Sequence, residues 1–233
     1  MMANLLVASD FNLYSRQVPD IAALCQHDDF YQLLIEKESE CLSNILGECL
    51  YDDLKANLEF DANEERFIVK DNAEDRWKWL VYGHKYQHDN NLPNTIGLNF
   101  GGCNCGCNEG NCDKHWEGLL CENVYRDYKF PNGRGFYTSL IIDYVFYFFL
   151  IELRSSTTIT GETIVKAKNT VPSSSIVKEQ TSWNSFVTKT KHCSKGSKVS
   201  LFTFLRDHSD LFPNWYPNKD FTCKDVTKNY WSI

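Results

Sequence analysis

The sequence lacks the features that mark secreted and nucleotide-binding proteins. Met1–Asp10 has no basic segment followed by a long apolar stretch, and no Asn-x-Ser/Thr glycosylation site occurs in the chain, so nothing predicts secretion. The glycine-rich stretch Gly101–Gly110 carries cysteines in place of the Lys and Ser/Thr of a P-loop. We therefore expect a chain that is made in the cytoplasm, with its ten cysteines mostly reduced.

Little in the sequence predicts catalysis. Asp143 stands alone in an apolar segment, without a second carboxylate or a histidine at a spacing known from enzymes. We expect it to be a hydrogen-bonded core residue or a polar contact at an interface. We expect scattered surface or hydrogen-bonded core positions for His27, His84, His88, His192 and His208. The prediction is that this chain is not an enzyme.

A membrane-spanning segment is not expected either. Phe136–Leu153 is very apolar, but Asp143 and Glu152 leave only eight uninterrupted apolar residues between them. A spanning helix needs about 20. The segment is therefore predicted to be a buried core helix, and no membrane is expected among the partners.

Acidic and basic residues are unevenly distributed along the chain. Residues 1–90 carry 18 Asp and Glu against 8 Lys and Arg, whereas residues 154–206 carry nine basic residues and two acidic ones. The pI near 5.4 argues against a dedicated nucleic-acid-binding protein. An acidic lobe and a basic arm on one chain suit self-association or stacking against another protein.

The hydrophobic pattern predicts a mainly α fold, a small helical bundle around a buried aromatic helix. Apolar residues recur at three- and four-residue steps over Asp28–Gly47. Gly135–Arg154 is apolar nearly all round, which is typical of a helix surrounded by other elements. Further helices are expected at Cys49–Leu54, Asn72–Tyr86, Ser173–Lys191 and Val199–His208, with a polar loop at Glu59–Asp71.

We expect one helical domain over residues 28–210, with two non-helical parts. Residues 87–134 are rich in Gly, Asn and Cys and are predicted to be an irregular loop insertion. Residues 155–172 are predicted to be an extended β-hairpin arm, because β-branched residues surround a central Thr-Gly. Residues 1–27 are expected to be an N-terminal arm, and residues 211–233 a tail extended on its own or a neighbouring surface. The arm residues are Thr157, Thr158, Ile159, Thr160, Gly161, Glu162, Thr163, Ile164 and Val165.

The stretch CNCGCNEGNCDKH is the densest group of chemically distinctive residues. Its thiols and imidazole are the ligands that a tetrahedral structural zinc ion uses. The candidate ligands are Cys103, Cys105, Cys107, Cys112 and His115. The Cys-x-Cys-x-Cys spacing lacks the two-residue gap of zinc ribbons and fingers, so unliganded thiols and a local disulfide stay open as alternatives. A bound ion would staple a loop that has no core of its own.

Several short phrases occur in a recognisable order. ECLSNILGECLYDDL precedes RWKWLVYGHKY and HWEGL, and an aromatic helix then precedes SSTTITGETIVKAKNTVPSSS and WNSFV. This layout resembles the head-to-tail connector (adaptor) proteins of tailed bacteriophages, especially the larger versions in phages of Bacteroides-like hosts. The resemblance covers roughly residues 28–190. The cysteine-rich stretch and the residues after Lys191 lie outside it.

The resemblance implies a structural virion protein of the neck, located between the capsid and the tail. It implies a ring homo-oligomer, a dodecamer, beneath the portal protein and next to tail or other neck proteins. Genomic DNA would pass through the lumen without its sequence being read. The β-hairpin arm and the termini would contact neighbouring subunits or rings.

Two other functions stay open at this point. A zinc-stapled cytosolic protein-binding module predicts stoichiometric zinc and a stable monomer. A metal-dependent hydrolase built around the Cys/His loop would need an activated water and a general base, for which Glu109 and Glu117 offer thin support. A connector subunit predicts instead a ring oligomer, or a monomer that assembles only on the portal.

Overall fold

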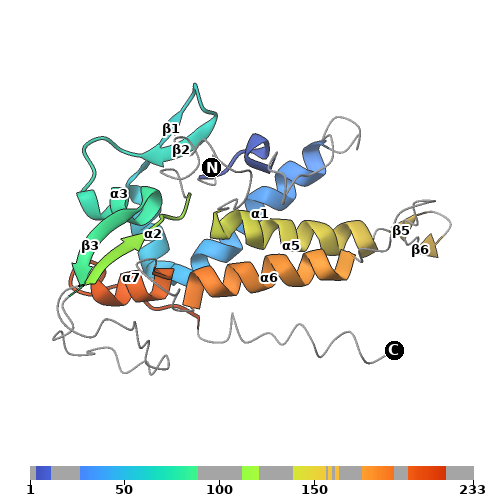
Figure 1. Ribbon diagram of the computed structural model, residues 1–233. Coiled ribbons are helices and arrows are strands. Elements are labelled where there is room, and N and C mark those ends of the chain that lie inside the picture. Colours follow the sequence, from blue (N-terminus) through green and yellow to red (C-terminus); the bar gives the residue numbers. More distant parts are fainter. Residues whose placement is uncertain are drawn as a thin grey trace, which may run out of the picture.

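The structure is a computed structural model that describes residues 4–11, 27–88, 112–120, 139–155, 157–158, 161–162, 175–191 and 199–218. The fold is mainly helical, as expected (Figure 1). The helices are the 3-10 helix η1 (Ala8–Phe11), α1 (His27–Leu46), α2 (Glu48–Ala56), α3 (Asp75–Tyr82), α5 (Leu140–Ser155), α6 (Ser175–Lys191) and α7 (Leu201–Asp207). Three antiparallel pairs of short strands join β1 (Leu58–Asp61) to β2 (Arg66–Val69), β3 (His84–His88) to β4 (Cys112–Trp116), and β5 (Thr157–Thr158) to β6 (Gly161–Glu162).

Helix α5 is the centre of the fold and lies between α1 and α6 (Figure 1). Every position from Leu140 to Phe146 is buried, as expected for a segment that is apolar nearly all round. Ser139 caps the helix, because its Oγ accepts the N–H of Ile141 at 3.1 Å and donates to the carbonyl of Leu119 at 2.5 Å. Among the described residues, no helix combines the length and the apolar character that a bilayer crossing requires.

The corner between α1 and α2 depends on Gly47. Its φ of 81° lies in the left-handed region, and a Cβ at this position would lie 2.3 Å from the carbonyl oxygen of Tyr216. The chain crosses the corner there, because the Tyr216 N–H donates to the carbonyl of Leu46 and the Trp215 Nε1–H donates to that of Ile45. A side chain at position 47 would displace this crossing segment.

The residues that follow Asp210 begin inside the core. Phe212 and Trp215 are buried, and the Trp215 ring makes an edge contact with Phe202 of α7 at 5.3 Å. The prediction of an extended surface tail is therefore wrong for this first part of residues 211–233. Large apolar rings bury themselves where a helical corner leaves apolar surface uncovered. Residues 219–233 lie outside the described part of the chain.

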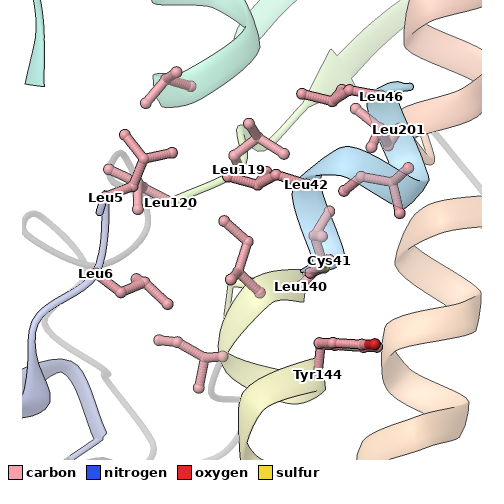
Figure 2. Packing of buried hydrophobic residues seen from close by; sticks show 14 of the residues in the cluster. Leu5, Leu6, Cys41, Leu42, Leu46, Leu119, Leu120, Leu140, Tyr144 and Leu201 are labelled. Carbon is pink, nitrogen blue, oxygen red and sulfur yellow. The ribbon is translucent and has the colours of Figure 1, made fainter. Parts of the chain in front are cut away.

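The N-terminal segment is also part of the core. Leu5, Leu6 and Phe11 are almost fully buried, and Figure 2 shows Leu5 and Leu6 facing side chains from α1, α5 and the segment after β4. The N-terminal arm predicted over residues 1–27 is therefore part of the core in residues 4–11, where η1 and these apolar side chains fold back onto the bundle. Residues 12–26 are not among those described.

A buried glutamic acid side chain holds this segment in place. Glu38 of α1 is fully buried, and its two oxygens accept the N–H groups of Leu5 at 2.5 Å and Leu6 at 3.1 Å. These donors favour the charged form, but the loss of water outweighs them and raises the pKa of Glu38 to about 8. The Arg66–Asp10 ion pair, at 3.2 Å, fixes the end of the same segment.

The expected polar loop at Glu59–Asp71 is wrong, because the structure forms the β1–β2 hairpin there. In β1, Leu58 and Phe60 alternate with acidic residues and oppose Val69 and Phe67 of β2, so these four side chains form one apolar face of the hairpin. The alternation of apolar and polar residues spans only four residues in each strand, and the charged residues of the turn between them favoured the prediction of a polar loop.

The expected helix over Asn72–Tyr86 is shorter and ends at Tyr82. Gly83 has a φ of 100°, and a Cβ there would lie 2.7 Å from the carbonyl oxygen of Trp116. Because the backbones approach so closely at Gly83, β3 can follow α3 directly and pair with β4. The prediction of an irregular insertion over residues 87–134 is therefore wrong for Cys112–Trp116, which forms strand β4. Trp116 anchors that strand through an Nε1–H bond to the Leu80 carbonyl at 3.0 Å.

We predict that stability falls as pH rises from about 4.5 to about 8, owing to Glu38. Its pKa is 4.5 when unperturbed and about 8 in the folded chain, so the folded chain binds a proton more tightly over this interval. Replacement of Glu38 by Gln removes this titration and flattens the pH profile of the free energy of unfolding, measured in urea. The exposed Glu36→Gln variant serves as the control and keeps the profile. An unchanged slope in Glu38→Gln would contradict this assignment.

Candidate assembly surface

Helices α5 and α6 form an antiparallel pair joined by a buried ion pair. Asp143 of α5 is fully buried, and its Oδ2 accepts bonds from Ser185 Oγ at 2.6 Å and Lys189 Nζ at 2.7 Å. The expectation that Asp143 is a hydrogen-bonded core residue is confirmed. Because a buried carboxylate tolerates few alternative positions for its donors, the pair fixes the register of the two helices.

A second polar contact joins α5 to α1. The Tyr144 hydroxyl donates to Glu40 Oε1 at 2.9 Å, and Lys37 Nζ contacts Glu40 Oε2 at 2.7 Å. Burial raises the pKa of Tyr144, so the phenol stays protonated and acts as a donor. Lys37 Nζ also lies 4.3 Å from the centre of the Phe148 ring. These contacts position the outer face of α5 against α1.

Burial decreases along α5 towards its C-terminal end. The side chains from Leu140 to Phe146 are buried, whereas most of those from Tyr147 to Leu153 are partly exposed although they are apolar. We call this second part the distal half of α5. Val177, in the first turn of the adjoining α6, is 56% exposed. The helical pair therefore presents apolar side chains that its own chain does not fully cover.

The predicted arm lies at the distal end of this helical pair. Strands β5 and β6 pair Thr157 with Glu162 and Thr158 with Gly161, and Figure 1 shows them beyond the ends of α5 and α6. The remaining arm residues, Ile159, Thr160, Thr163, Ile164 and Val165, lie outside the described part of the chain. Contact of this arm with a neighbouring subunit stays a prediction.

An acidic hairpin lies near the other end of α5. Phe60 of β1 is 55% exposed and contacts Phe67 across the hairpin at 5.5 Å. Glu59 and Glu65 are exposed beside it. We call β1, β2 and their turn the acidic hairpin. The sequence-based prediction missed it as a candidate surface, and the alternating Leu58-x-Phe60 pattern is the signal that could have revealed it.

The acidic hairpin and the arm therefore lie at opposite ends of the central helix (Figure 1). The 16 residues of α5 correspond to a length of about 24 Å at the usual helical rise. One molecule thus carries an acidic surface at one end and, in residues 154–206, a basic segment that starts at the other.

The predicted zinc ligands are described only in part. Cys112 is the first residue of β4 and pairs with His88, and His115 lies three residues further on. Cys103, Cys105 and Cys107 lie outside the described residues. The groups of His, Cys, Asp and Glu that can be examined in the described part contain no metal-binding set of three or more. The zinc site stays a prediction.

Histidines that the sequence shows as scattered come together between β3 and α7. The His84 ring stacks on Trp79 at 4.1 Å, and the His208 ring contacts Tyr86 at 4.5 Å. Burial, and then the imidazoles of His208 and His115, lower the pKa of His84, which therefore stays neutral at neutral pH. Stacked rings of this kind pack the β3–β4 hairpin onto α7.

An ion pair completes this packing. Asp207 of α7 accepts bonds from the Tyr86 hydroxyl at 2.8 Å and from Lys114 Nζ at 3.2 Å, and the side chains of Asp207 and Lys114 are nearly buried. The paired charges satisfy one another where water has little access. The cluster is accordingly a structural junction that anchors the base of the cysteine-rich stretch.

The chain matches no protein-family model, no curated protein and no solved structure. The candidate assembly surface is therefore defined by the structure alone. It consists of the distal half of α5, the arm that follows it and the acidic hairpin.

We predict that Lys189→Ala lowers the free energy of unfolding by about 2–3 kcal/mol, since it removes the ammonium group that lies 2.7 Å from the buried Asp143 carboxylate. Lys178→Ala on the exposed face of α6 is the matched control and changes stability by less than about 0.5 kcal/mol. Adding Asp143→Asn to Lys189→Ala recovers part of the loss, because the buried negative charge that lost its Lys189 contact disappears. Urea unfolding measures all four chains, and equal losses for the two lysine variants would contradict the coupling.

Proposed function

We propose that this chain is a structural subunit of the connector ring in the neck of a tailed bacteriophage, between the portal of the capsid and the tail. The observation that carries the proposal is the α5–α6 pair, which bears incompletely covered apolar side chains and ends in the β5–β6 hairpin. An interface with another chain would cover this apolar surface. The order of sequence phrases supports the same class of protein.

The positions of charge support a ring rather than a symmetric pair. A ring closes when one surface of each subunit contacts a different surface of the next. The acidic hairpin and the basic segment that begins at Arg154, at the other end of α5, are two different parts of the chain with opposite charge, as such a contact requires. The resemblance to connector proteins implies a ring of twelve subunits. In the neck, this ring would contact the portal on one side and other neck or tail proteins on the other, and DNA would pass through its lumen.

A zinc-stapled protein-binding module is the second candidate, and one observation favours it. Strands β3 and β4 bring His88 and Cys112 into register, so the two ends of the intervening cysteine-rich stretch are held together at a packed base. A metal ion bound within that stretch would order it against a support that already exists.

The ring is tested by the size and shape of the purified chain, alone and mixed with isolated portal rings. We expect closed rings in negative-stain images and a matching mass in sedimentation. A variant with a Gly-Ser-Gly linker in place of Thr157–Val165 is expected to keep its unfolding midpoint, because β5 and β6 lie beyond the helical bundle, and to lose the rings.

A chain that stays monomeric both alone and with portal rings would overturn the proposed function. Rings of unchanged size in the linker variant would leave the ring in place and remove the arm from its interface.

Zinc is tested by metal analysis of the chain purified under reducing conditions. The second candidate predicts one zinc ion per chain, which is lost when Cys103, Cys105 and Cys107 are replaced together by Ser. The matched control replaces Cys49, which is exposed on α2, and keeps the metal content of the unmodified chain. Ring assembly that survives the triple replacement, with no zinc in the unmodified chain, would contradict every zinc-dependent role.

A further inference from the structure

The acidic hairpin has one strand edge that no other described residue of the chain pairs with. In β2, the Phe67 N–H donates to the Asn4 carbonyl at 2.8 Å and the Val69 N–H to the Tyr82 hydroxyl at 3.0 Å, so these residues direct their backbone groups away from β1. Directly opposed residues in an antiparallel pair share this direction. Phe60, which opposes Phe67, therefore directs its N–H and C=O outward from β1.

The two edges of the hairpin consequently differ. The N-terminal segment and Tyr82 occupy the outer edge of β2, whereas no backbone partner for the outward groups of Phe60 occurs among the described residues. The Phe60 side chain is 55% exposed at the same place. An exposed strand edge with an uncovered aromatic residue is a template for an added strand.

The sequence of the basic segment matches this edge in period and in charge. In β1, Glu59 and Asp61 occupy one face and Phe60 the other, since strand positions alternate. In the sequence VKAK, Lys166 and Lys168 show the same spacing of two, and the small residue Ala167 lies between them. An added strand in this register would place each lysine beside an acid and Ala167 beside Phe60, in either strand direction.

We propose that the outer edge of β1 binds residues Val165–Lys168 of a second copy of this chain by strand addition. This inference rests on the proposed ring and names the contact that closes it. Backbone hydrogen bonds to Phe60 hold the added strand, and the pairing of Lys166 and Lys168 with Glu59 and Asp61 sets its register. A neighbouring copy is the donor because the β5–β6 hairpin lies at the end of α5 remote from β1 (Figure 1).

The test is a charge exchange between the two surfaces in the full-length chain. One variant carries Glu59→Lys with Asp61→Lys, and the other carries Lys166→Glu with Lys168→Glu. Each alone has like charges at the contact, so its self-association is expected to weaken by about tenfold or more. An equimolar mixture presents opposite charges at every contact and is expected to regain assembly. Sedimentation velocity measures assembly under the condition in which the unmodified chain forms rings, either alone or with portal rings.

Two further variants make the result specific. Glu48→Lys with Asp52→Lys gives the same change of net charge on the exposed face of α2 and is expected to assemble normally. Glu59→Gln with Asp61→Asn keeps the side-chain sizes of β1 and is expected to weaken assembly by less than the charge reversal. It also decides the question if the charge-reversed chain fails to fold, which its unfolding midpoint reveals.

The outcomes separate this contact from the proposed function. If the unmodified chain forms rings and the two charge-reversed chains form them equally well, the β1 contact is overturned and the ring stands. The contact is also overturned if the mixture fails to recover assembly, or if the α2 control loses it. If the unmodified chain forms no rings, alone or on the portal, the proposed function fails and the contact fails with it.

Discussion

The fold depends on a buried charge in the middle of an otherwise apolar helix. Aromatic and aliphatic side chains surround α5 on nearly every side, so the polar contacts of Asp143, together with the Tyr144–Glu40 bond, restrict how the helix can rotate or slide against its neighbours. The carboxylate accepts bonds from Ser185 and Lys189 of α6, and these bonds favour one register of the two helices. That register determines where the α5–α6 pair ends and therefore where the arm is carried.

The first and the last described segments of the chain, residues 4–11 and 212–218, both pack onto the helical core. The Leu5–Phe11 segment covers α1 and the β2 edge through Glu38 and the Arg66–Asp10 pair. Residues 212–218 cover the corner at Gly47. Because the N-terminal segment occupies the outer edge of β2, the outer edge of β1 is the exposed edge of the acidic hairpin. The candidate assembly surface is thus defined partly by what the termini cover.

The sequence predicted the long helices and the central buried one, because their apolar spacing is regular over many residues. It also predicted a hydrogen-bonded Asp143. It failed at the acidic hairpin, where four-residue strands give a short pattern and the charges of the turn dominate, and at β3–β4, whose strands are separated by 23 residues between His88 and Cys112. The His84–His208 cluster could not be predicted because it forms only when β3 packs on α7. Tertiary contacts of this kind leave no local signal.

The crossing of Tyr216 over Gly47 has a consequence for synthesis. Residues 215–218 are the last described part of the chain to leave the ribosome, yet they complete a corner formed by residues 44–47 near its beginning. The α1–α2 corner stays exposed to solvent until almost the whole described chain has emerged. The core can therefore close only after translation has passed residue 218, by which time the residues of the arm and of the acidic hairpin have both been made.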